Sequence, residues 1–89
     1  MVIITHVRMV GGAGHEHIGE VRWWNPTTGA MGSSSRAVMV DWMLNQNGIV
    51  RVTDGTRIVD VRVVQAQPSY LRTWQDGVWT DDLLALPNY

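Results

Sequence analysis

The chain has 89 residues, a formal net charge of −1 and no cysteine, which limits it to one small domain without disulfides or thiolate metal ligands. The charge argues against a general nucleic-acid binder, because proteins that neutralise phosphates usually carry a basic surplus. No apolar run approaches the roughly 20 residues of a membrane helix and no signal peptide is recognisable, so we expect a cytoplasmic protein.

The N-terminal part is expected to form a β-meander. Residues 2–10 are mostly β-branched or apolar and predict a strand, which the glycine-rich segment 11–14 ends. A second strand is expected at about 17–24. A turn of the sequence Asn-Pro-Thr-Thr-Gly and a short third strand near 30–33 follow it.

One helix is expected, from Arg36 to about Gln46. The three serines at 33–35 supply its N-cap, and Asn47-Gly48 ends it with a left-handed C-cap. Its apolar residues cover well over half of its circumference, whereas a helix on the surface of one sheet has a narrower apolar stripe. We therefore expect it to be covered on more than one side, either by another part of the chain or by a partner.

Two hairpins and a C-terminal extension follow the helix. The hairpins turn at Asp-Gly pairs and join strands expected at 49–53 and 57–65, and at 70–74 and 78–80. Residues 81–87 predict one acid-capped helical turn, stopped by proline. The whole chain, 1–89, therefore predicts a single α+β domain: about five to seven antiparallel strands packed around one central helix, in the order ββ(β)-α-ββ.

Several short stretches are familiar as a group. They are Ile4-Thr5-His6-Val7-Arg8, Gly14-His15-Glu16-His17-Ile18, Ser34-Ser35-Arg36, Met39-Val40-Asp41-Trp42, Tyr70-Leu71-Arg72-Thr73 and Asp81-Asp82-Leu83-Leu84-Ala85-Leu86-Pro87. With these the chain resembles, over nearly its whole length, domain of unknown function 3892 (DUF3892), a family of small proteins of bacteria and their phages. Family members often have Asp-Asn in place of Asp81-Asp82. The resemblance implies a stand-alone domain in a bacterial or phage setting, and it brings no established activity, cofactor or catalytic residue.

His15 and His17 are the most metal-like feature. On a strand, residues two apart point to the same face, so both imidazoles could contact one ion. If residues 11–14 close a hairpin with Val10 opposite His15, then His6 shares that face, but a slip of one residue moves His6 to the other face. Two histidines at this spacing are a weak signal, and most such histidines simply bond to backbone or carboxylates. A small metal-binding protein or hydrolase using His6, His15 and His17 is one alternative function, and no other cofactor is predicted.

No catalytic set is recognised in the sequence. Helix capping explains the serines at 33–35, and the glycine-rich segment 11–14 leads into a strand and lacks the Gly-Lys-Ser/Thr ending of a phosphate-binding loop. Asp81 and Asp82 are adjacent, which favours the first turn of a helix over a catalytic pair.

Tryptophan and arginine are unusually prominent. The chain has five tryptophans and no phenylalanine, and all of its seven basic residues are arginine. These two residue types are enriched at binding hot spots, although tryptophan could also replace phenylalanine in the core, with arginines packed over it. Trp23 and Trp24 are neighbours on a strand and cannot both enter one core face. We place Trp42 in the core and select as the candidate interaction surface Arg22, Trp24, Arg72, Trp74 and Trp79.

The leading hypothesis is a small non-enzymatic protein-interaction module of phage or mobile-element origin. It would act as an assembly component or bind a host protein, in the bacterial cytoplasm or in association with the virion. The expected partner is another protein or a second copy of the chain, with no membrane involved. A nucleic-acid-binding domain is the third hypothesis, which the net charge disfavours.

Overall fold

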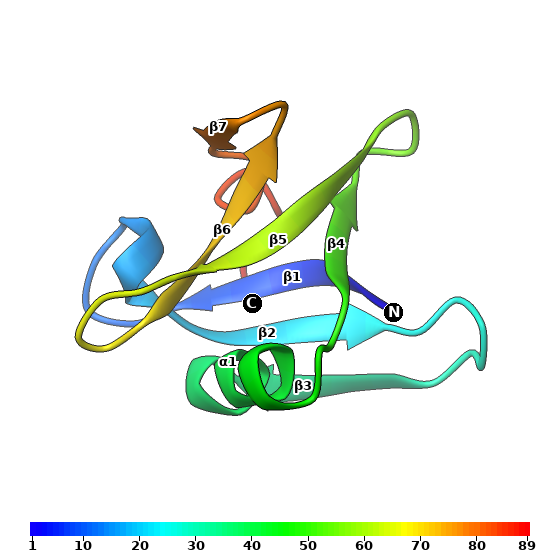
Figure 1. The fold of residues 1–89 in the computed structure, drawn as a ribbon, viewed down its shortest axis with the longest axis horizontal. Helices are drawn as coiled ribbons and strands as arrows, with labels where there is room; N and C mark the ends of the chain where they lie inside the picture. Colours follow the sequence, from blue (N-terminus) through cyan, green and yellow to red (C-terminus); the bar gives the residue numbers. More distant parts are fainter.

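The computed structural model describes all 89 residues and contains one seven-stranded sheet and one α-helix (Figure 1). The strands are β1 (Val2–Met9), β2 (Ile18–Trp24), β3 (Met31–Ser35), β4 (Val50–Thr53), β5 (Ile58–Val64), β6 (Tyr70–Gln75) and β7 (Val78–Thr80). The helix α1 spans Arg36–Asn45, and a 3-10 turn, η1, spans His15–His17. The helix lacks the length and apolar character needed to cross a bilayer. The predicted α+β class and the order of elements are confirmed.

The strand β1 joins two halves of the sheet, in the order β3-β2-β1-β4-β5-β6-β7. One edge of β1 pairs with β2 from Ile3 to Met9, whereas the other edge forms a parallel pair with β4 only at Val2 and Ile3. Further along that edge the C-terminal residues replace β4, because Val7 N–H donates to the Pro87 carbonyl and Tyr89 N–H donates to the Val7 carbonyl. Figure 1 shows β4 to β7 inclined steeply across β1 to β3.

The core lies between the two halves of the sheet. In β5, Val59 and Val61 are buried while Asp60 and Arg62 face solvent, as the alternation of the sequence predicts. The helix contributes Met39, and the segment after β7 contributes the fully buried Leu83. The core cluster comprises Val2, Ile4, Val7, Ile18, Val21, Met39, Val50, Val52, Val59, Val61, Leu71 and Leu83.

Most of the predicted turns and caps are present. The Ser35 side chain accepts a hydrogen bond from Val38 N–H, which confirms the serine cap. Asn47 adopts the left-handed conformation after the helix, with φ of 53°. Gly48 is needed for a different reason, since a Cβ there would overlap the Trp42 ring. At the turn between β6 and β7 both Asp76 and Gly77 have positive φ, as a tight two-residue hairpin requires.

The turn between β4 and β5 is longer than the two residues expected. The strands end at Thr53 and resume at Ile58. Asp54 Oδ1 accepts hydrogen bonds from Thr56 N–H and Arg57 N–H, so the aspartate side chain organises a four-residue loop. An Asp-Gly pair is therefore compatible with a two-residue turn, as at Asp76-Gly77, and with a four-residue loop, as at Asp54-Gly55. The hydrogen bonds of the Asp54 side chain distinguish the longer loop.

The helix is less covered than its sequence indicates. It packs against β2, β3, β5 and β6, yet Val38 and Leu44 expose 58% and 50% of their surface. The expectation that the chain itself covers a second side of α1 is therefore wrong, because Leu83 enters the core between the sheet halves and leaves these helix residues open. Cover by a partner stays a prediction.

Replacing Leu83 with alanine should strongly destabilise the fold. Removal of a fully buried leucine side chain costs about 2–5 kcal/mol, because the transfer free energy is lost and a cavity remains. Leu44→Ala is the matched control, since the same truncation at a half-exposed position should cost at most about 1 kcal/mol. Urea denaturation followed by tryptophan fluorescence measures both. Equal losses would show that Leu83 does not hold the sheet halves together.

Candidate interaction surface

The three candidate metal ligands contact different partners. His15 and His17 lie in the 3-10 turn η1 and not on a strand, so residues two apart do not share a face. His17 Nδ1 lies 3.1 Å from the Val10 carbonyl oxygen, and His6 Nδ1 lies 2.9 Å from Thr5 Oγ1. No three His, Cys, Asp or Glu side chains converge as a metal site. The expected strand geometry is therefore wrong, while metal binding itself stays a prediction for zinc titration of the wild type and His17→Ala.

His15 is the buried member of the three. Its Nε2 atom has no hydrogen-bond partner, and the nearest carboxylate oxygen, Asp81 Oδ1, lies 3.7 Å away. Burial lowers the pKa of His15 and the nearby Arg72 guanidinium lowers it further, against the opposing charges of Asp81 and Glu16. The His15 imidazole is therefore neutral near pH 7, which suits a packed structural residue.

Two arginines tie the segment after β7 to the sheet. Arg72 of β6 donates from Nε to the Thr80 carbonyl and from Nη2 to Asp81 Oδ1, at 3.1 and 2.9 Å. Arg57 donates from Nη2 to Asp82 Oδ1 at 3.1 Å and from Nη1 to Gln75 Oε1 at 2.9 Å. Arg72, selected from the sequence as an interaction residue, thus has bonds within its own chain.

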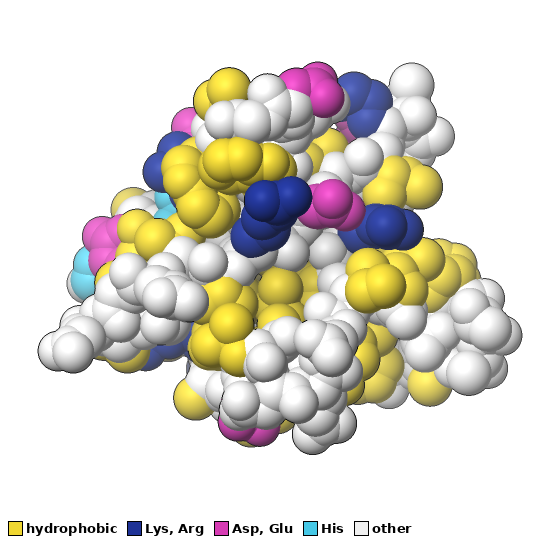
Figure 2. Space-filling view, in the orientation of Figure 1, with side chains coloured by type: hydrophobic (Ala, Val, Ile, Leu, Met, Phe, Trp, Pro, Cys, Tyr) yellow, Lys and Arg dark blue, Asp and Glu magenta, His cyan; other side chains and the backbone are white.

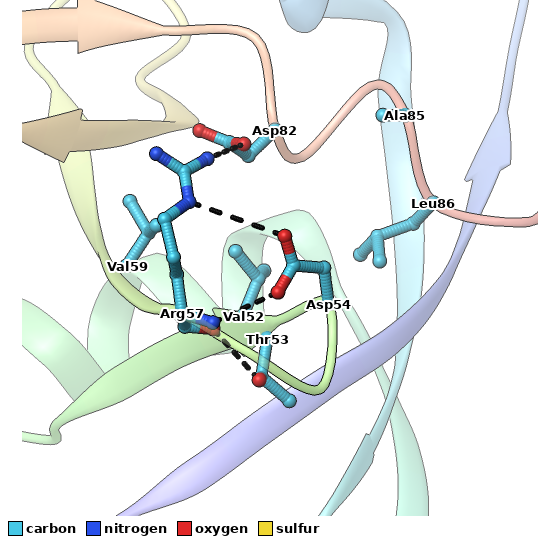
Figure 3. A pocket seen from close by; sticks show the side chains of 8 residues that line it. All are labelled: Val52, Thr53, Asp54, Arg57, Val59, Asp82, Ala85 and Leu86. Carbon is cyan, nitrogen blue, oxygen red and sulfur yellow. Dashed lines mark hydrogen bonds and ion pairs between the residues drawn. The ribbon is translucent and has the colours of Figure 1, made fainter.

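Arg57 also lines a pocket of about 330 Å³ between the β4–β5 hairpin and the C-terminal segment (Figure 3). Its guanidinium lies between Asp82 and Asp54, whose Oδ2 is 3.9 Å from Arg57 Nε. The backbone N–H groups of Arg57 and Thr56 lower the pKa of Asp54, which keeps this carboxylate charged. Because the arginine is bonded inside the protein, this pocket is best described as a structural clamp.

The outer face of β4 to β7 carries exposed aromatic, apolar and guanidinium side chains together. On β5 the residues of this face alternate with the buried valines. Across the strands, Arg51 lies opposite Asp60, Asp60 opposite Trp74, and Trp74 opposite Trp79. Figure 2 shows basic and acidic side chains alternating over β4 and β5, next to apolar ones. We call this set the aromatic–arginine face: Arg51, Ile58, Asp60, Arg62, Trp74 and Trp79.

The two tryptophans of this face form a fixed pair. Their ring centroids are 4.9 Å apart and the planes meet at 82°, an edge-to-face contact. Arg62 lies over Trp74, with Cζ 4.8 Å from the ring centroid, in a cation–π arrangement. Trp79 and Ile58 remain 37% and 63% exposed, beside a pocket of about 540 Å³.

Charge on the aromatic–arginine face is only partly compensated. Arg51 Nε lies 3.0 Å from Asp60 Oδ1, which neutralises both groups. Arg62 forms no ion pair, and Asp76, the other acid beside the pocket, lies in the β6–β7 turn without a basic partner. The Arg62 guanidinium therefore faces solvent, with the Trp74 indole beneath it and no carboxylate partner.

The structure brings together only part of the surface selected from the sequence. Trp74 and Trp79 are in contact, whereas Arg22 and Trp24 lie on β2, with β1, β4 and β5 between β2 and β6. Sequence reasoning missed Arg62 and Ile58. The outward alternation on β5 was a visible signal for both, but it could not show that Arg62 lies over Trp74.

Arg22, although exposed, contacts the C-terminal residue. Its Cζ lies 4.0 Å from the Tyr89 ring centroid, and the Tyr89 hydroxyl donates to Glu20 Oε1 at 2.6 Å. Burial and the neighbouring Glu20 raise the pKa of Tyr89 to about 12. Arg22 therefore holds the C-terminus against β2.

These features define a small α+β domain with one strongly twisted sheet and an exposed aromatic–arginine face. The chain belongs to the family described as Protein of unknown function (DUF3892), whose model matches residues 3–87, nearly the whole chain. The resemblance drawn from the sequence is thus confirmed. Searches of curated proteins and of solved structures found no match.

The buried His15 should make stability depend on pH. Because its folded-state pKa is lowered, the unfolded chain binds a proton first as the pH falls below about 6.5, and the free energy of unfolding decreases down to the lowered pKa. In His15→Gln the decrease in the free energy of unfolding should be smaller. Urea denaturation between pH 7.5 and pH 5 measures it. The control variant His17→Gln, which replaces a more exposed histidine, should keep the full decrease in the free energy of unfolding. An unchanged pH dependence in His15→Gln would contradict the assignment.

Proposed function

We propose that this protein is a non-enzymatic interaction module that binds a partner protein through the aromatic–arginine face. The observation that carries the proposal is the Trp74–Trp79 pair with Arg62 over it, on an outward sheet surface. Tryptophan and arginine supply much of the energy of protein interfaces. Their mutual contacts also restrict these side chains before binding, which lowers the entropy cost of ordering them in a complex.

Charge and shape indicate the chemistry of the partner. Arg62 offers a planar guanidinium without a carboxylate, and Ile58 and Trp79 offer exposed apolar surface beside it. A partner that presents a carboxylate next to an aromatic or aliphatic side chain complements both features. We propose a different protein as the partner, and the sedimentation experiment below tests self-association as the alternative.

The geometry of the indoles favours protein over nucleic acid. Single-stranded nucleic acids bind by stacking their bases on open aromatic faces. Here the two rings meet at 82°, and Arg62 covers one face of Trp74.

The proposal includes a biological setting. The family resemblance supports a bacterial or phage protein, and we propose a role as an assembly component or host-protein binder of phage or mobile-element origin. The host-cell cytoplasm, or a virion assembled there, is the proposed place of action.

Selection from a displayed library of random peptides tests the binding chemistry. The wild type should enrich peptides with Asp or Glu beside Trp, Tyr or Leu. A selected peptide should lose at least about tenfold in affinity for Trp79→Ala and for Arg62→Glu, because each change removes a central contact of the face. Fluorescence anisotropy of the labelled peptide measures this. Met31→Ala, which removes an exposed apolar side chain on β3, is the matched control and should bind normally.

The same variants distinguish the competing functions. Failure to enrich any peptide, or equal affinity of all variants for the selected peptide, would refute the proposal. Binding of a single-stranded oligonucleotide at low salt that is lost in Arg62→Glu would favour a nucleic-acid function instead. A concentration-dependent dimer in sedimentation, abolished by Trp79→Ala, would favour self-association.

A further inference from the structure

A third cavity lies between α1 and the strands β2 and β3, on residues that the aromatic–arginine face does not use. Its volume is about 410 Å³, which falls within the roughly 300–1,000 Å³ of small-molecule sites. Val38, Asp41 and Trp42 line it from the helix, at spacings of three and four residues that define one helix face. Trp23 lines it from β2. We call this cavity the α1 groove.

Both indoles of the α1 groove are held in place by their surroundings. The Trp23 Nε1–H donates to Ser34 Oγ at 3.0 Å, and its ring lies so close to Gly32 that a Cβ there would be 2.7 Å from Cζ2. The Trp42 ring lies against Gly48 in the same way. These glycine contacts fix the two ring planes without a ligand, so the walls of the groove are formed in advance.

The only charged residue that lines the α1 groove is Asp41. Asn45 Nδ2 donates to its Oδ1 atom, and no arginine or histidine forms an ion pair with it. The remaining polar lining is neutral, from Asn25, Ser34 and Gln46. A carboxylate without a counter-charge and two tryptophan side chains therefore line the same groove.

This combination selects a cation with an apolar body. The faces of indole rings carry negative electrostatic potential and attract ammonium groups, most strongly for tryptophan. Alkyl substituents on the nitrogen would contact the rings and the exposed Val38, and the Asp41 carboxylate would complete charge neutrality. An anion would meet a carboxylate, and a neutral ligand would leave Asp41 without a counter-charge.

We propose that the α1 groove binds an organic ammonium ion, an amine carrying alkyl groups. The expected ligand of the groove is positively charged, whereas the unpaired guanidinium of the aromatic–arginine face favours a negatively charged carboxylate. The two sites share no residue. Binding at the groove is therefore independent of the proposed protein partner.

Choline and its neutral isostere 3,3-dimethylbutan-1-ol, in which carbon replaces nitrogen, test the charge requirement directly. In ¹H–¹⁵N correlation spectra of the whole chain, choline should shift the indole N–H signals of Trp23 and Trp42. The indole signals of Trp24, Trp74 and Trp79 serve as internal controls and should stay in place. Choline should bind at least about tenfold more tightly than the isostere. Equal binding of the two, or no shift at Trp23 and Trp42, would overturn the proposal.

Asp41→Asn tests the carboxylate without changing side-chain size at an exposed position. It should weaken choline binding by about threefold or more, because the cation loses its counter-charge. Asp76→Asn, which removes an exposed carboxylate outside the groove, should leave binding unchanged. Unaltered affinity in Asp41→Asn would refute the proposed role of Asp41 and with it the site.

A second ligand identifies the source of the ammonium group. Acetyl-trimethyllysine amide presents the same trimethylammonium group as choline on a peptide-like body. Tighter binding of this compound would assign the groove to a modified protein side chain, and tighter binding of choline to a free amine or a headgroup. Each of these outcomes supports ammonium recognition, whereas no binding of either compound overturns it.

Discussion

The insertion of Leu83 between the two halves of the sheet is the contact on which the rest of the structure depends. The strands β1 and β4 pair at only two positions, so backbone hydrogen bonds join the halves over a short distance. Leu83 is fully buried and belongs to the core cluster that contains residues of both halves. The bonds of Arg57 to Asp82 and of Arg72 to Asp81 hold the segment that carries Leu83, and β1 then pairs with residues 87–89.

The two proposed sites arise from different periodicities of the same small fold. On β5 a period of two puts Val59 and Val61 into the core and leaves Arg62 outside, where β6 brings Trp74 beneath it. On α1, Asp41 and Trp42 follow Val38 by three and four residues, so all three line the groove, and the half-buried Trp42 also packs against the core as the sequence predicts. The apolar width of the helix thus reflects two surfaces, the core around Met39 and the wall of the groove.

Local signals predicted the elements well because they act within a few residues. The cap at Ser35, the left-handed Asn47 and the Asp76-Gly77 turn all depend on neighbouring backbone groups. The segment His15–His17 was predicted less well, as the start of a strand. Its 3-10 turn buries His15 near Arg72 and Asp81, which are distant in the sequence, so no local pattern could indicate it. The histidine hypothesis depended on that strand.

The sequence by itself determined the α+β class, the family, and which side chains of each strand point out of the core, because alternation and capping are local properties of the chain. Only the tertiary structure decided which outward residues become neighbours. Strand order and register follow from long-range packing, and they place Arg62 over Trp74 while separating Trp24 from Trp79. The pairing of Asp41 with two indoles in one groove likewise exists only because α1 packs against β2 and β3.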